Sequence, residues 1–385
     1  MKIIFAGPAH PYRGGPASFN DRLAKQFSAE GHEVEIITFS LQYPGFLFPG
    51  KTQYTDAPKP EGIKIERKIN SVNPFSWISV GYKIKKAKPD ILLLRYWLPF
   101  FGPSFGTVAR IVKSNKKSVV ICIFDNVIPH EKRAGDKLLT KYFVSAIDGA
   151  IVMSQSVQDD LYTFRENIPV KLSPHPLFDN YGSSASREKA LSALNLSPDY
   201  SYLLFFGFIR EYKGLDLLIE SFADKRLRNS KLKLLVAGEF YEDDTPYRDI
   251  IKKYGLENDI IIFDRFIKDD EVYLFFSAAD LVVQPYRSAT QSGVTQIAFH
   301  FDKPMIVTDV GGLREIVPDG KCGYVVKPEA SAISEAILDY FGNNRKEDFT
   351  EGVIKEKEKF SWDKMTKSIF EVYGEIYPPV PLKGG

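Results

Sequence analysis

The chain holds little cysteine, little histidine and no long apolar run, and each shortage excludes a class of protein. Its two cysteines, Cys122 and Cys322, form no CxxC pair, so we expect neither the disulfide framework of a small secreted domain nor a structural zinc site. The five histidines lack HxxxH spacing and no Asp-x-Asp sequence occurs, which predicts no metal site. The most membrane-like stretch, residues 91–105, is interrupted by Arg95 and Pro99 and is shorter than the roughly 20 apolar residues of a spanning helix. We therefore expect a cytoplasmic protein that needs no metal ion and no cofactor.

What is present is typical of a folded protein of several domains. Hydrophobic residues make up 44% of the 385 residues and charged residues 26%, which excludes disordered, collagen-like and coiled-coil chains. The net charge of +2 hides an asymmetry, because residues 1–178 hold 24 basic against 15 acidic residues and the remainder holds 27 against 34. Lysine clusters at 83–88 and 110–117 are either a solvated helix face or a contact with an anionic membrane surface. Without interleaved aromatic residues they do not predict nucleic-acid binding.

Apolar periodicity predicts two α/β domains. Residues 2–6 and 34–39 read as buried strands, and 16–29 as the helix between them, since Phe19, Leu23 and Phe27 recur every four residues. Small and polar residues over 179–201 indicate a boundary, after which the alternation restarts. The other predicted strands cover residues 91–94, 119–124, 150–153, 202–209, 232–237, 260–263, 281–284 and 305–308, with helices near 215–222 and 362–373. Two parallel sheets covered on both faces place ligand sites in the loops at the carboxyl ends of the strands.

One such loop has the composition of a diphosphate site. Gly207 follows a predicted strand, and Arg210, Lys213 and Gly214 precede the next helix. Glycine permits close backbone approach, the helix N-terminus carries partial positive charge, and the two cations supply full charge. The alternative is an ordinary turn with solvated cations.

Two further loops have features of an anion site. Residues 285–294 follow a strand and open a helix, where Ser292 is expected to act as the N-cap and the amides of Gly293 and Val294 are expected to be free. In the first half, Gly14 and Gly15 precede a helix that starts with proline. Because this loop lacks the G-x-G-x-x-G pattern, the sequence disfavours a nicotinamide-dependent dehydrogenase.

These loops, taken in order, resemble glycosyltransferase family 4. The resemblance is carried by Gly14-Gly15, residues 31–34 (GHEV), Gly207 with Arg210 and Lys213, residues 303–315 (KPMIVTDVGGLRE) and the closing 360–362 (FSW) helix. It implies a GT-B fold, with two facing Rossmann-like domains: an acceptor domain over 1–180 that a C-terminal helix, 360–378, crosses back to join, and a nucleotide-sugar donor domain over 200–358. It also implies a retaining, metal-independent transfer of a sugar from a UDP- or GDP-linked donor to a glycan or lipid-linked acceptor.

The resemblance assigns roles by position. Arg210 and Lys213 match the pair that neutralises the donor diphosphate, and the Gly14-Gly15 loop matches the one that approaches the same phosphates. Glu315 matches the glutamate of the family's G-G-x-x-E stretch, as an organiser of a loop beside the donor. Glu239, after Gly238 at another predicted strand end, is either a contact to the nucleotide or a structural residue.

The sequence also departs from the family pattern. The two glutamates of the E-x7-E motif fall on Ala289 and Ile297, unless a local shift brings in Gln291 or Gln296, whose amides bond hydroxyls without charge. Asp125 stands where the family commonly has a histidine near the donor sugar, and His130 follows five residues later. We expect Asp125 to orient a hydroxyl or to stabilise an oxocarbenium-like centre, or else to form a loop contact.

Aromatic residues in the first domain suggest the acceptor side. Residues 43–50 and 96–103, the latter including Trp97, are rich in aromatic side chains, and their prolines and glycines predict loops rather than helices. Together with the basic first half they favour a lipid-linked acceptor and a peripheral position on the inner face of a membrane. Burial in the protein's own core is the alternative.

Two other functions are compatible with these motifs. A sugar-nucleotide epimerase on the same fold would convert the donor without an acceptor. A non-catalytic nucleotide-sugar-binding protein would explain the missing glutamates.

Overall fold

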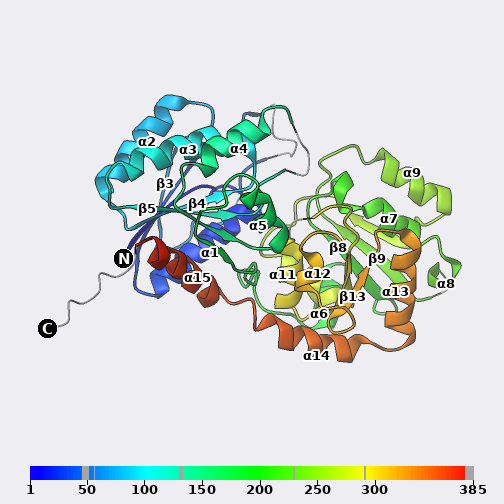
Figure 1. Cartoon of the computed structure of the whole chain (residues 1–385). Coiled ribbons are helices and arrows are strands. Elements are labelled where there is room, and N and C mark those ends of the chain that lie inside the picture. Colours follow the sequence, from blue (N-terminus) through cyan, green and yellow to red (C-terminus); the bar gives the residue numbers. More distant parts are fainter. Residues whose placement is uncertain (46–51, 56, 130–132, 229, 290–291, 378–385) are drawn as a thin grey trace. The chain divides into compact units, whose positions relative to one another are not determined.

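The computed structural model describes residues 1–45, 52–55, 57–129, 133–228, 230–289 and 292–377. The chain divides into two compact units. The first unit contains residues 1–175 together with those from 362 onward, and the second contains residues 176–361 (Figure 1). The polar stretch 179–201, where the sequence predicts a boundary, thus lies inside the second unit.

The first unit is built on a seven-stranded parallel sheet in the order β3-β2-β1-β4-β5-β6-β7. Its strands are β1 (Lys2–Ala6), β2 (Glu33–Leu41), β3 (Lys64–Asn70), β4 (Ile91–Tyr96), β5 (Val119–Phe124), β6 (Gly149–Val152) and β7 (Val170–Leu172). Its helices are α1 (Gly15–Ala29), α2 (Pro74–Ala87), a 3-10 turn (Pro99–Phe101), α3 (Gly102–Lys113), α4 (Asp136–Val144), α5 (Gln155–Tyr162) and α15 (Trp362–Ile376). Every residue of β4 and β5 is buried, as in a strand covered on both faces.

Helices α2, α3 and α4 lie side by side on one face of this sheet (Figure 1). Helix α2 begins because the Asn73 side chain accepts a hydrogen bond from the Phe75 amide, and it ends at Lys88 in the left-handed conformation. On the opposite face, Phe19, Leu23 and Phe27 of α1 are fully buried, as the four-residue spacing predicts.

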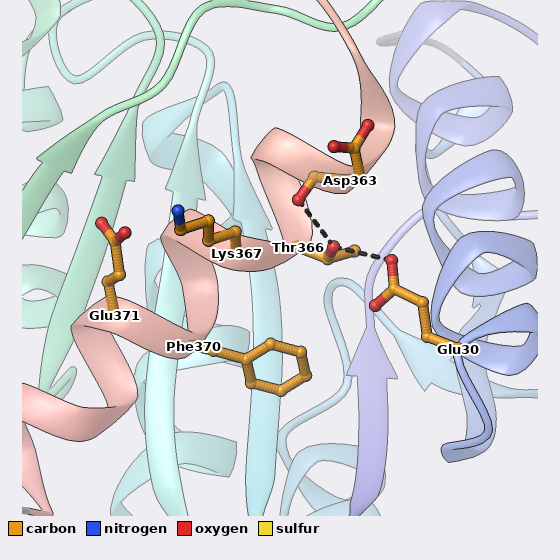
Figure 2. Close-up of a pocket in the computed structure, with 6 residues that line it drawn as sticks. All are labelled: Glu30, Asp363, Thr366, Lys367, Phe370 and Glu371. Carbon is orange, nitrogen blue, oxygen red and sulfur yellow. Dashed lines mark hydrogen bonds between the residues drawn. The ribbon is translucent and has the colours of Figure 1, made fainter.

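The closing helix α15 packs on the first unit, against α1 and strands β5, β6 and β7. Thr366 donates a hydrogen bond to Glu30 at the end of α1, over 2.8 Å (Figure 2). Beside this contact lies a shallow hollow lined by Glu30, Asp363, Thr366, Lys367, Phe370 and Glu371. With three carboxylates against one lysine, this hollow does not fit an anionic ligand.

The second unit contains a six-stranded parallel sheet in the order β10-β9-β8-β11-β12-β13. Its strands are β8 (Ser201–Phe206), β9 (Leu232–Ala237), β10 (Ile260–Phe263), β11 (Leu281–Gln284), β12 (Met305–Thr308) and β13 (Gly323–Val326). Its helices are α6 (Arg187–Ala193), a 3-10 turn (Glu211–Lys213), α7 (Leu215–Ser221), α8 (Lys225–Arg228), α9 (Thr245–Tyr254), α10 (Val272–Ala278), α11 (Gly293–His300), α12 (Leu313–Ile316), α13 (Ala330–Gly342) and α14 (Lys346–Lys357). In the described part of the chain, no helix is both long and apolar enough to cross a membrane.

Candidate functional site

The loop after β8 brings three strand ends of the second unit together. The Gly207 amide donates to the carbonyl of Ala237 over 2.9 Å, which ties the end of β8 to the end of β9. A Cβ on Gly238 would stand 1.9 Å from the Gly207 carbonyl oxygen, and one on Gly214 would stand 2.1 Å from the Pro285 carbonyl oxygen after β11. These separations are far below van der Waals contact, so only glycine allows the loops to approach this closely.

Lys213, one of the two cations predicted to hold a diphosphate, is buried in this loop. Its ammonium stands 3.2 Å from where a Cβ of Gly207 would be, and 5.7 Å from the ring centroid of Tyr286. Burial, reinforced by the positive charge of Arg210, lowers the pKa of Lys213 to about 7. No carboxylate within the described residues pairs with this ammonium. A cation that is buried beside another cation is stabilised by an incoming anion.

The residues that flank Arg210, Ile209 and Glu211, are hydrogen-bonded to the loops after β9 and β11. The Ile209 amide donates to the Glu239 carbonyl over 2.9 Å, and the Arg210 guanidinium lies 5.2 Å from the ring centroid of Tyr241. On the other side Arg287 forms a bidentate ion pair with Asp216 of α7, with contacts of 2.6 and 2.5 Å. This ion pair, which motif reasoning missed, ties the loop after β11 to the helix that follows Lys213.

The start of α11 lies next to the same loop. A Cβ on Gly207 would contact the Val294 side chain at 3.5 Å. The expectation that the Ser292 side chain caps α11 is wrong, because its hydroxyl lies 3.3 Å from the Tyr286 hydroxyl and makes no capping bond. Gly293 packs tightly against Phe178, at 2.8 Å from a Cβ in its place. Ser292 therefore does not cap the first amides of α11 with its side chain.

One turn further along α11, the Gln296 side chain is fully buried. Neither its amide nitrogen nor its amide oxygen has a hydrogen-bond partner among the described residues. A buried amide without hydrogen bonds lowers the stability of the folded state by about 1–3 kcal/mol, unless a ligand or water completes its hydrogen bonds. By contrast, the neighbouring Thr295 hydroxyl bonds to the Gln284 side chain over 3.3 Å.

Two other candidate residues of the second unit, Glu239 and Glu315, lie after β9 and in α12. Glu239 is buried at the end of β9, next to Gly238. Glu315 is exposed in the single turn of α12. Gln291 lies outside the described residues.

In the first unit, the glycine loop has the predicted form. Gly14 adopts φ +105°, a conformation that favours glycine, and Pro16 occupies the first turn of α1. A Cβ on Gly15 would meet no other atom within 4 Å. The loop therefore exposes backbone at the carboxyl end of β1.

Asp125 has a partner that sequence reasoning did not identify. At the end of β5, its carboxylate accepts two hydrogen bonds from Arg95 of β4, of 2.7 Å from Nε and 2.5 Å from Nη2. Arg95 is 3% exposed, and its guanidinium lies 3.8 Å from the ring centroid of Phe19. The ion pair holds the carboxylate in one orientation at the strand end, where a loop aspartate alone would rotate. His130 lies outside the described residues.

The prediction that residues 96–103 form an exposed aromatic loop is wrong. Tyr96 and Phe101 are buried, and α3 begins at Gly102, because proline and glycine are tolerated in the first turn of a helix. Trp97 is half-buried, with its ring 4.3 Å from that of Phe101 and its Nε1 donating to the Tyr43 hydroxyl over 2.9 Å. Most of the other stretch, residues 46–50, lies outside the described residues.

The second-unit loops can thus hold an anion through one buried ammonium, one guanidinium and backbone amides. Over residues 1–45, 52–55, 57–129, 133–228, 230–289 and 292–377, no group of three histidine, cysteine or carboxylate side chains is placed to hold a metal ion. In the first unit, the Gly14 loop and the Asp125–Arg95 pair lie at the carboxyl edge of one sheet.

Comparison with known proteins identifies the class of enzyme. Residues 186–356 match the family described as Glycosyl transferases group 1. An uncharacterised glycosyltransferase of Methanocaldococcus jannaschii is 28% identical over 97% of this chain and 98% of its own length. A second uncharacterised glycosyltransferase of that organism is 30% identical over 46% of this chain and 49% of its own length.

Solved structures share the whole fold. Sucrose-phosphate synthase from Thermosynechococcus elongatus superposes with a TM-score of 0.75 at 16% identity, covering 98% of this chain and 99% of that chain. HepE from Anabaena, in complex with UDP, superposes with a TM-score of 0.73 at 15% identity, covering 97% and 100%. The predicted GT-B fold and the resemblance to glycosyltransferases are therefore confirmed, and the chain is a glycosyltransferase.

Proposed function

From the premise that this chain is a GT-B glycosyltransferase, we propose that it moves a sugar from a UDP- or GDP-linked donor to a glycan or lipid-linked acceptor. The transfer retains the configuration of the anomeric carbon and needs no metal ion. The observation that carries the proposal is the buried Lys213 ammonium, which stands beside Gly207 without a carboxylate partner in the described chain.

The chemistry follows from where charge develops. As the glycosidic bond breaks, the departing nucleoside diphosphate gains negative charge, and we expect the cations Lys213 and Arg210 to stabilise it. The amides at the start of α11, which the Ser292 side chain does not cap, add donors that need no reorganisation. Removing one donor of this kind typically costs about a hundredfold to a thousandfold in rate.

Gln296 takes part in binding the donor. Its buried amide offers two N–H donors and one carbonyl acceptor, which suit the hydroxyl groups of a nucleoside or sugar. This assignment explains how the site holds a nucleotide sugar without the glutamates that the family usually carries. The UDP bound by HepE, a protein of the same fold, supports a nucleotide as the ligand.

Asp125 of the first unit acts on the sugar or the acceptor. The Arg95 pair fixes both carboxylate oxygens at the strand end, and each oxygen keeps a lone pair for a hydroxyl. A fixed carboxylate near an anomeric carbon stabilises an oxocarbenium-like centre. Arg95 is a positioning residue in this arrangement.

A panel of UDP-, GDP- and ADP-sugars, measured by thermal shift, tests donor binding. A ligand that binds only the folded state raises the melting temperature, so at least one member should do so in wild type. Lys213→Met should abolish the shift, whereas Lys252→Met, at an exposed lysine of α9, should keep it. A panel without any shift, or an undiminished shift in Lys213→Met, contradicts the proposal.

Turnover with the selected donor tests the chemistry. Activity should persist in EDTA, and proton NMR of the product should show the donor's anomeric configuration. Loss of activity in EDTA with rescue by manganese contradicts metal independence. Conversion of the donor to an epimer when no acceptor is present would favour the epimerase alternative.

A further inference from the structure

Two helices of the first unit, α2 and α4, expose large apolar side chains. Phe75 is 82% exposed, Leu138 is 71% exposed and Tyr82 is 58% exposed. With Ile78 and Tyr142, which are also exposed, these residues lie on α2 and α4, which flank α3 on one face of the sheet (Figure 1). Of the eleven large apolar side chains exposed in the described part of the chain, five belong to this α2–α4 surface.

Apart from Tyr142, whose ring lies 3.9 Å from the Arg110 guanidinium of α3, the exposed groups lie on faces that these helices do not use for packing. On α2, Phe75, Ile78 and Tyr82 follow helical spacing along one stripe, while Val80 and Ile84 are buried on the other side. On α4, Leu138 and Tyr142 are one turn apart. Both helices therefore bury one apolar face against the first unit and still expose other apolar side chains to solvent.

The same surface is strongly basic. Helices α2, α3 and α4 contain seven lysine and arginine residues and one acidic residue, Asp136. Lys83 pairs with Glu66, and Lys113 pairs with Asp148. Four lysines have no carboxylate partner within the described residues and remain available to an anionic ligand: Lys85, Lys86, Lys137 and Lys141.

We propose that the α2–α4 surface docks the protein on the anionic face of a lipid bilayer. Apolar side chains on helices that lie flat enter the boundary between headgroups and acyl chains, and neighbouring lysines contact anionic headgroups. A second copy of the chain is a poor occupant, because the same surface of that copy carries the same positive charge. Docking through this surface does not depend on sugar transfer. It would place the membrane contact on α2 and α4 rather than on the aromatic stretches 43–50 and 96–103.

Co-sedimentation of the full chain with vesicles tests the inference. Binding is expected to phosphatidylcholine vesicles that contain phosphatidylglycerol, and it should weaken as salt screens the lysines. Phe75→Ser with Leu138→Ser should reduce partitioning at least about tenfold. Lys86→Gln with Lys141→Gln should reduce it by about fivefold per lysine.

Matched variants elsewhere separate docking from general effects. Ile354→Ser, at an exposed apolar residue of α14, controls for the apolar change, and Lys252→Gln with Lys253→Gln on α9 controls for the charge change. All variants should melt within a few degrees of wild type, since the residues are exposed. Absence of binding at low salt, equal binding to neutral vesicles, or equal losses in the controls overturns the proposal. So does light scattering that shows a wild-type dimer dissociated by Phe75→Ser with Leu138→Ser.

Discussion

If Lys213 holds the donor diphosphate as proposed, its lowered pKa should make nucleotide-sugar binding depend on pH. In the free protein this pKa is about 7, because burial and the nearby Arg210 guanidinium both disfavour the ammonium. A bound diphosphate favours the ammonium and raises the pKa again. Binding above pH 7 must therefore take up a proton, and affinity must fall as the pH rises.

The magnitude follows from the fraction of Lys213 that is charged before binding. With a free pKa of about 7, roughly half of the molecules carry the ammonium at pH 7 and about one in a hundred at pH 9. The association constant should therefore fall by about fiftyfold over this range. A nucleotide sugar is the appropriate ligand because its diphosphate diester does not titrate there.

Isothermal titration calorimetry measures this uptake directly. At pH 8 the apparent binding enthalpy should vary with the ionisation enthalpy of the buffer, with a slope near one proton per site. Lys213→Arg should bind with no uptake, since arginine stays charged, and Lys213→Met should bind weakly with no uptake. The reasoning is refuted if wild type takes up no proton at pH 8, or if Lys213→Met takes up as much as wild type.

Three further predictions concern single side chains. Gln296→Leu removes an unsatisfied buried amide, so in urea denaturation it should raise the free energy of unfolding by about 1–2 kcal/mol, yet it should weaken nucleotide-sugar binding. Gln284→Leu breaks a buried hydrogen bond and should instead lower the free energy of unfolding. Asp125→Ala should lower the free energy of unfolding by about 3 kcal/mol, because it leaves the buried Arg95 guanidinium without its carboxylate partner. Asp125→Ala with Arg95→Met should recover most of this loss. A loss below about 1 kcal/mol in the single variant would show that the ion pair is not coupled to folding. Gly149→Ala places a Cβ 2.4 Å from a side chain of α15, so it should lower the free energy of unfolding by about 1–3 kcal/mol. An unchanged melting temperature would mean that α15 shifts to accommodate the methyl group without loss of stability.

The fold was predictable where strands are buried on both faces. Residues 91–94 and 119–124 are continuous apolar runs, and both form central strands, because a central parallel strand must be apolar on both sides. The strands that escaped prediction are β3, β7 and β13, all at sheet edges. In β3, four of seven residues are charged, since an edge strand is partly solvated and its apolar pattern is correspondingly weak.

The candidate site was predictable where chemistry depends on residues that are close in sequence. Gly207, Lys213 and Gly214 fall in one loop, so their composition and spacing indicated an anion site. The Arg95–Asp125 pair joins two strands 30 residues apart, and the isolation of Gln296 depends on its surroundings. Neither leaves a local pattern in the sequence. The missing Ser292 cap likewise depends on a competing hydroxyl, that of Tyr286.

The place of α15 has a consequence for how the protein is made. Residues 362–376 cover β5, β6 and β7 of the first unit, although 186 residues of the second unit separate them from it in the chain. During translation the second unit can therefore complete its core before the ribosome releases the helix that covers this part of the first sheet. A chain that stalls late in synthesis leaves that apolar sheet face open, and it is there that we expect nascent chains to recruit chaperones.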